Sequence, residues 1–218
     1  MICRPDFSRL SARRAGFTLV ELLTVIAIIL VLAGLLLYVA GNANYKSSFA
    51  RAQTEVKAME TALESYKADN GTYPRTATAG QGTDSINAQS NNDPGSGSSY
   101  TDAGKILFQA LSGVPSAAGG TYGKRYMDFK SGQLSSGTAD PSATTYVIDP
   151  FGLAYGYSTR GAYGAEQKQT NANLDTSTYG YNPTFDLWST GGYGAGGRQY
   201  SKSGLSATAY NTLWAKNW

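Results

Sequence analysis

Apolar residues run without interruption from Phe17 to Ala40, with Glu21 as the one charged residue and no proline. As a helix, these 24 residues extend about 36 Å, enough to cross the roughly 30 Å hydrocarbon core of a membrane. A carboxylate inside such a span costs roughly 2.5–3.5 kcal/mol on insertion scales, so it indicates a functional role. The pattern predicts a transmembrane helix with a purpose for Glu21.

A helical pattern of another kind follows, with one apolar residue every three or four positions. The stripe consists of Phe49, Ala52, Val56, Met59, Leu63 and Tyr66. Such a stripe is typical of a helix packed on a domain. Two ion pairs are expected beside it, Arg51–Glu55 and Glu64–Lys67. Asp69-Asn70-Gly71 is a stop signal, so we predict one helix of about 53 residues over 17–69. The alternative is a break at Gly41-Asn42 between an anchor and a separate helix.

The remainder, residues 72–218, alternates short apolar runs with turn residues. We expect a polar loop insertion over 76–100, followed by a helix from Thr101-Asp102 to Gly113. A strand is expected over 122–129. Strands 144–148 and 153–157 should form a hairpin around Asp149-Pro150-Phe151-Gly152, and a last strand is expected over 184–189. The tail from Leu205 to Trp218 is expected to tie back to this head. The predicted fold class is α+β, a long helix on a small antiparallel sheet with glycine-rich loops.

Composition excludes several kinds of chemistry. The chain has no histidine, so His-dependent triads and most transition-metal sites are excluded. Its single cysteine, Cys3, forms neither a disulfide framework nor a thiolate cluster. The head has scattered aspartates but no paired-carboxylate motif, and we predict that it is not an enzyme. We expect its tyrosines and tryptophans to form the core rather than a sugar-binding platform.

The net charge of +3 lies entirely in residues 1–16, where four arginines oppose Asp6. The other 202 residues balance at 14 basic and 14 acidic side chains, so nucleic acid is not an expected partner. Basic residues before an apolar span keep the N-terminus in the cytoplasm and send the remainder outward. The charge pattern therefore predicts a single-pass membrane protein with a cytoplasmic N-terminus and its head on the other side of the membrane.

Three interpretations of the N-terminal segment compete. A secretory signal peptide has a shorter apolar region, although Gly41-Asn42-Ala43 is a weak cleavage site. A plain anchor leaves Glu21 unexplained. The run from Gly16 to Glu21, GFTLVE after a basic leader, resembles the type IV prepilin signature. That resemblance implies that a prepilin peptidase removes residues 1–16 by cutting between Gly16 and Phe17, and that the Phe17 amine is methylated. It also implies that Glu21 pairs with the amine of a neighbouring subunit, which relieves two charges in hydrocarbon.

Three further stretches are similar to the major pseudopilin of type II secretion systems: residues 60–74, 149–152 and 185–191. The resemblance implies a structural subunit that polymerises with itself into an envelope pseudopilus. It implies as partners the peptidase/methyltransferase, minor pseudopilins, an inner-membrane platform and a secretion ATPase. The transmembrane half of the helix, 17–40, would form the filament core, and its amphipathic half, 41–71, would carry the head. A type IV pilin for adhesion or motility is the alternative within this class. A membrane-anchored carbohydrate-binding or hydrolytic module is the alternative outside it.

The late loop departs from that family's pattern, Ser-x-Gly-x-Asp-Gly, in which the aspartate helps to bind calcium. Here the run is Ser189-Thr190-Gly191-Gly192-Tyr193-Gly194, so Tyr193 stands in place of the carboxylate. Calcium sites usually contain carboxylates, and Asp186 is the one weak candidate nearby. We therefore expect no calcium site and no other cofactor.

Overall fold

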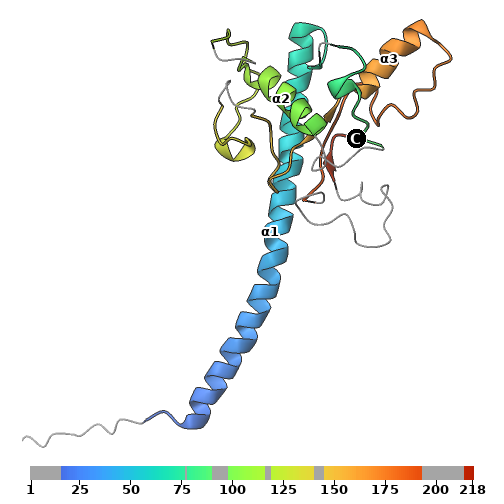
Figure 1. Ribbon diagram of the computed structural model, residues 1–218. Coiled ribbons are helices and arrows are strands. Elements are labelled where there is room, and N and C mark those ends of the chain that lie inside the picture. Colours follow the sequence, from blue (N-terminus) through green and yellow to red (C-terminus); the bar gives the residue numbers. More distant parts are fainter. Residues whose placement is uncertain (1–15, 77, 90–97, 116–118, 140–144, 193–213) are drawn as a thin grey trace, which may run out of the picture. The chain divides into compact units, whose positions relative to one another are not determined.

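The computed structural model describes residues 16–76, 78–89, 98–115, 119–139, 145–192 and 214–218. The chain divides into two compact units, Met1–Tyr45 and Lys46–Trp218, which are described separately below. Within the second unit, called the head, helices α1, α2 and α3 surround a small sheet (Figure 1). The predicted α+β class is confirmed.

Helix α1 spans Leu19–Asn70 and is unbroken at Gly41-Asn42. Within the head, the predicted stripe is the buried side of this helix. Ala52, Val56, Met59 and Leu63 are fully buried, with Phe49 and Tyr66 packed partly buried at either end. The helix stops where the sequence predicted, because Gly71 takes φ +78° and donates its N–H to the Lys67 carbonyl at 2.7 Å.

Helix α2 spans Ser98–Ser112, so it begins three residues before the predicted start. It buries Leu107, Phe108 and Leu111 in the core that α1 also lines. Its end is as predicted, at Gly113, where φ is +69°. Helices α1 and α2 therefore each contribute about one buried side chain per turn to the same core.

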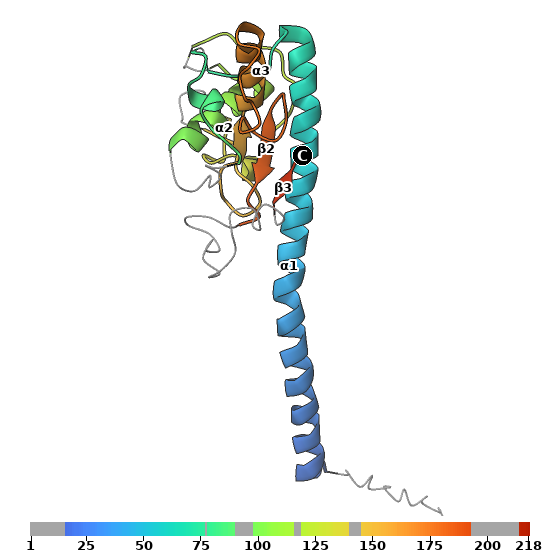
Figure 2. The same ribbon diagram turned by 90° about the vertical axis from the view of Figure 1, so that its right-hand side faces the viewer.

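The sheet is antiparallel with strand order β1-β2-β3. Its strands are β1 (Gly156–Ser158), β2 (Asp186–Ser189) and β3 (Ala215–Lys216). Tyr157 pairs with Leu187 and Ser189 with Ala215. Both views place the sheet beside the head part of α1 (Figures 1 and 2). The predicted strand over 184–189 and the predicted return of the tail are confirmed, because β2 lies within that range and β3 pairs with it.

One predicted strand is wrong, and one predicted hairpin is present but shorter than expected. Residues 122–129 form no strand, because this segment wraps the end of α2 and the Tyr126 and Met127 N–H groups both bond to the Leu111 carbonyl. The hairpin pairs antiparallel around the predicted turn through the Ile148–Ala154 bridge, and the Asp149 and Tyr155 N–H groups donate to the Leu153 and Val147 carbonyls. Beyond the bridge the chain pairs with β2 instead, which is central to the sheet.

In two polar segments the structure differs from the sequence-based prediction. Residues 76–100 were expected to form a loop rather than a packed element, but Ile86 and Ala88 are buried there and a 3-10 turn spans Gly82–Asp84. Helix α3 (Arg160–Thr170) was not predicted at all. Two of its glycines are required by packing, because a Cβ at Gly161 would overlap the Asn182 carbonyl oxygen and a Cβ at Gly164 would lie 2.6 Å from the Tyr179 ring.

A buried carboxylate fixes the turn that leads into β2. Asp186 is 1% exposed and accepts the backbone N–H groups of Tyr181 and Asn182, each at 2.9 Å. Burial raises the pKa of Asp186 to about 6, because it outweighs the two backbone hydrogen bonds that lower it. The turn is thus held by a group that titrates near neutral pH.

This shift predicts a pH dependence of folding. The pKa of this carboxyl is about 3.9 in the unfolded chain and is higher in the folded head. The stability that the group contributes is therefore fully present below pH 4 and is lost as the pH rises through 6. The free energy of unfolding of Asp186→Asn minus that of wild type should therefore increase by on the order of 2 kcal/mol as the pH rises from 4 to 7. Chemical denaturation at several pH values, followed by tryptophan fluorescence, measures the difference.

The control is Asp175→Asn, since hydrogen bonds from Ser177 lower the pKa of the exposed Asp175 carboxyl. Its pH trend should be small and of the opposite sign. A constant difference between Asp186→Asn and wild type from pH 4 to 7 would contradict the assignment.

Candidate processing and assembly site

The predicted cleavage site lies just before α1. Gly16, Phe17 and Thr18 precede the first helical residue, Leu19, and are exposed. The Phe17 side chain is 81% exposed, and no atom approaches within 4 Å of a Cβ built on Gly16. Within the first unit, the bond proposed for cleavage is therefore accessible at the end of the helix.

Thr18 and Glu21 form a reciprocal cap at the start of α1. The Glu21 carboxylate accepts the Thr18 N–H at 2.9 Å and the Thr18 hydroxyl at 2.8 Å. The Thr18 hydroxyl oxygen in turn accepts the Glu21 N–H at 3.3 Å. This capping box follows from the Thr-x-x-Glu spacing, a signal that was present in the sequence but not used for the prediction. It satisfies backbone donors that a helix start in hydrocarbon leaves without water.

The following turns expose almost only apolar side chains; the exception is Thr24, whose hydroxyl donates to the Glu21 carbonyl at 2.9 Å. One window, Leu19–Leu36, is long and apolar enough to cross a membrane, and none of it is buried. Leu30 and Leu36 are each 71% exposed. A bare apolar surface of this extent needs lipid or other protein chains to cover it.

In the head, a second carboxylate of α1 is buried. Glu55 is 8% exposed; Arg51 Nε lies 2.7 Å from one of its oxygens, and the Tyr155 hydroxyl donates to the other at 2.7 Å. Burial raises the pKa of Tyr155 strongly, and the adjacent Glu55 charge raises it further, so the phenol stays a donor. The predicted Arg51–Glu55 pair is confirmed, and through Tyr155 it joins α1 to the segment before β1. Glu64 and Lys67, predicted to pair directly, both hydrogen-bond the Tyr73 hydroxyl instead.

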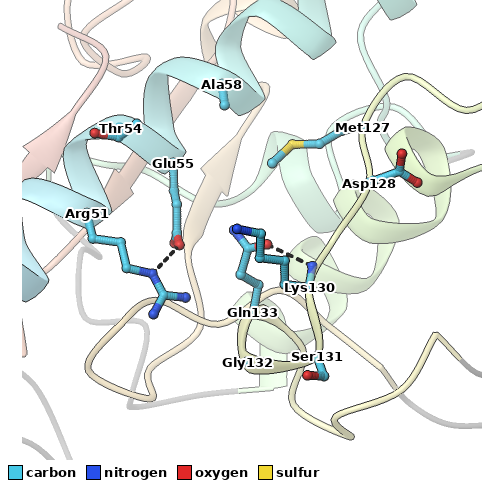
Figure 3. A pocket seen from close by; sticks show the side chains of 10 residues that line it. All are labelled: Arg51, Thr54, Glu55, Ala58, Met127, Asp128, Lys130, Ser131, Gly132 and Gln133. Atoms are coloured by element: carbon cyan, nitrogen blue, oxygen red, sulfur yellow. Dashed lines mark hydrogen bonds and ion pairs between the residues drawn. The ribbon is translucent and has the colours of Figure 1, made fainter.

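A groove of about 640 Å³ opens beside this pair, between α1 and the 127–133 segment (Figure 3). Its lining residues are Arg51, Thr54, Glu55, Ala58, Met127, Asp128, Lys130, Ser131, Gly132 and Gln133. The Gln133 side chain is occupied in accepting the Lys130 N–H at 2.9 Å. Asp128 pairs with Arg125 at 2.6 Å. Of the charged residues that line the groove, Arg51 pairs with Glu55, and the lining offers no arrangement of nucleophile and base.

Asp186, the one weak candidate for a metal ligand, already takes part in the turn before β2. Asp186 uses both carboxylate oxygens on the turn before β2. Tyr193 lies outside the described residues. Among the residues that are described, no three His, Cys, Asp or Glu side chains gather in a way that suits a metal ion.

Several of the aromatic side chains predicted to form the core do so, whereas Tyr122 and Tyr181 are exposed. Trp188, Tyr100 and Tyr157 are among the largest fully buried side chains. Tyr100 meets Trp188 edge-on, with ring centroids 6.0 Å apart. These rings are not available as a sugar-binding platform.

Comparison with known proteins agrees with the N-terminal geometry. Residues 11–37 match the family model of the prokaryotic N-terminal methylation motif, and residues 40–106 match that of type II secretion system protein G. The chain is similar to type II secretion system core protein G of Aeromonas hydrophila, 38% identical over 74 residues, which is 34% of this chain and 50% of that protein. The corresponding protein of Escherichia coli is 38% identical over 78 residues, 36% of this chain and 52% of that protein. No solved structure matches the chain.

The chain spans about half the length of the curated relatives it matches. The matched region contains the cleavage motif, the capped apolar helix start and the stripe of α1 on which the head is built. Residues 11–37 are therefore similar to the prokaryotic N-terminal methylation motif, and residues 40–106 are similar to type II secretion system protein G.

Proposed function

We propose that this chain is the structural subunit of a type II secretion pseudopilus. The observation that carries the proposal is α1 itself, a helix with a capped, bare apolar start after a methylation motif and a head packed on its other end. Before assembly, the apolar half lies in the inner membrane with the head in the periplasm. In the filament, the apolar halves of neighbouring copies cover one another.

Polymerisation requires partners that the chain itself does not supply. A prepilin peptidase cuts after Gly16 and methylates Phe17. An inner-membrane platform and a secretion ATPase drive addition of subunits, and minor pseudopilins begin the filament. The growing filament then moves folded proteins across the outer membrane.

The Glu21 carboxylate has two roles in this proposal. In the isolated chain it caps α1 together with Thr18. During assembly it receives the methylated amine of the neighbouring subunit's Phe17. A carboxylate already fixed at the helix start presents its charge in a defined place, which reduces the cost of pairing it in hydrocarbon.

The direct test of function is deletion of the gene in the source organism, followed by complementation. We expect loss of exported enzymes from the culture medium, with surface pili unchanged. Loss of piliation with normal export would indicate a type IV pilin instead. Normal export and normal piliation, with binding of the protein to glycans, would favour a membrane-anchored carbohydrate-binding module.

Processing provides the first prediction. Co-expressed with a prepilin peptidase, the wild-type chain should yield a mature protein that begins with N-methylated Phe17 in intact-mass spectrometry. Gly16→Leu should remain an inserted, unprocessed precursor, because a bulky side chain is placed at the bond to be cut. The control Gly34→Leu alters a glycine inside α1 that also has open space around it, and it should be processed normally. A mature start at Asn44 would indicate an ordinary signal peptidase and would contradict the proposal.

The second prediction separates the two roles of Glu21. Glu21→Gln keeps a capping side chain but removes the charge, and Thr18→Ala weakens the cap but keeps the charge. Both variants should insert and be processed. Export should fall on the order of tenfold or more in Glu21→Gln, since the neighbouring amine loses its partner, and much less in Thr18→Ala. Equal export by Glu21→Gln and wild type would rule out the charge-pairing role.

A further inference from the structure

The loop that follows β2 is where the resembling family places calcium, and this chain is poorly suited to hold it there. Residues 187–218 contain no Asp, Glu, His or Cys side chain. They do contain Arg198, Lys202 and Lys216, so the segment is cationic. Calcium takes six to eight oxygen ligands, usually with carboxylates among them. The segment offers only hydroxyl, amide and carbonyl oxygens, together with positive charge that repels a cation.

The start of this loop is instead held by a side chain from the 149–152 turn. One oxygen of the Asp149 carboxylate accepts the N–H groups of Phe151 and Leu153, each at 2.9 Å. The other oxygen accepts the Ser189 hydroxyl at 2.6 Å. The Ser189 oxygen then accepts the Gly191 N–H at 3.1 Å. Asp149 therefore connects the turn, the end of β2 and the first residues of the loop.

These hydrogen bonds are shielded from water. Ser189 is fully buried and Asp149 is 2% exposed. A carboxylate that accepts a hydroxyl in a buried place forms a stronger hydrogen bond than it would in water. The hydrogen-bonded residues Asp149, Ser189 and Gly191, called the latch below, therefore have the burial expected of a stabilising contact.

A second contact between the same turn and loop supports the latch. Gly192 has φ +82°, and a Cβ at this position would lie 2.9 Å from the Phe151 ring. Only glycine combines that backbone angle with so close an aromatic ring. The turn that supplies the Asp149 carboxylate thus also covers the loop with its neighbouring side chain.

The two buried aspartates near the loop do not fit a calcium ion. The Asp149 carboxylate already accepts three hydrogen bonds. Asp186 stands at the start of β2, whereas the loop follows the end of this strand, and its carboxylate accepts two backbone N–H groups. A calcium ion would have to share these carboxylates with the donors that they already accept, and residues 187–218 would supply no further side-chain carboxylate. The donors present therefore favour the latch over a cation.

We propose that this head holds the start of its late loop, residues 189–192, with the Asp149–Ser189–Gly191 latch in place of a calcium ion. This part of the loop is held without a metal, and we expect the stability of the head to be the same with and without calcium. This inference does not rest on the proposed function, because it concerns folding and not assembly.

The test is the melting temperature of the full chain in detergent, with EDTA, 1 mM calcium or 1 mM magnesium. All three tryptophans of the chain, Trp188, Trp214 and Trp218, lie in the head, so their fluorescence reports its unfolding. A calcium site with micromolar Kd would raise the melting temperature by roughly 10 °C in 1 mM calcium. We expect a shift of less than about 1 °C, equal to that in magnesium. A calcium-specific rise of several degrees would overturn the inference.

Variants then test the latch itself. Ser189→Ala should lower the melting temperature by about 5 °C, because a buried carboxylate loses its hydroxyl donor, and by the same amount in EDTA and in calcium. The control Ser65→Ala removes an exposed hydroxyl on α1 and should have little effect. An unchanged melting temperature in Ser189→Ala would contradict the latch. If this variant does not fold, the wild-type comparison in EDTA and calcium still decides the question, since it requires no substitution.

Discussion

The buried stripe of α1 is the constraint on which the rest of the head depends. Val56, Met59 and Leu63 are fully buried, and the core that covers them includes residues of α2, the sheet and the segment before β1. A sheet of three short strands gains stability when helices pack on its hydrophobic face, and α1 is one of the helices that supply this core. The helix that carries the apolar span therefore also contributes to the core of the head.

Carboxylates show how this protein handles the cost of buried charge. Glu55 is paired within the head with Arg51 and accepts a hydrogen bond from the Tyr155 hydroxyl. In the described chain the Glu21 carboxylate accepts hydrogen bonds from Thr18, and no ion pair to it is formed there. A paired charge favours a closed structure, whereas an unpaired one in an apolar span favours association with a cation. The two residues therefore suit different tasks, one in folding and one in assembly.

Regular periodicity made part of the fold predictable. The stripe, the stop at Gly71 and the turn at 149–152 were all recognised because they depend on local patterns. Helix α3 was missed because Gly161 and Gly164 weaken helix propensity, and only the close contacts of the folded head explain them. The false strand over 122–129 had suitable residues, but the end of α2 takes its hydrogen bonds. In the candidate site, the motif at residues 16–21 could be recognised from the sequence. The Thr18–Glu21 cap was not predicted, although its Thr-x-x-Glu spacing is also a sequence signal.

The central claim is that the apolar half of α1 leaves the membrane to pack against copies of itself. Its most direct test is disulfide cross-linking in cells that assemble the filament, since removal of residues 1–16 leaves a chain without cysteine. A cysteine in place of Leu30, which is 71% exposed, should give disulfide-linked dimers under oxidation, while one in place of the buried Leu63 should give none. Monomers from both variants, in cells that still export protein normally, would contradict the account.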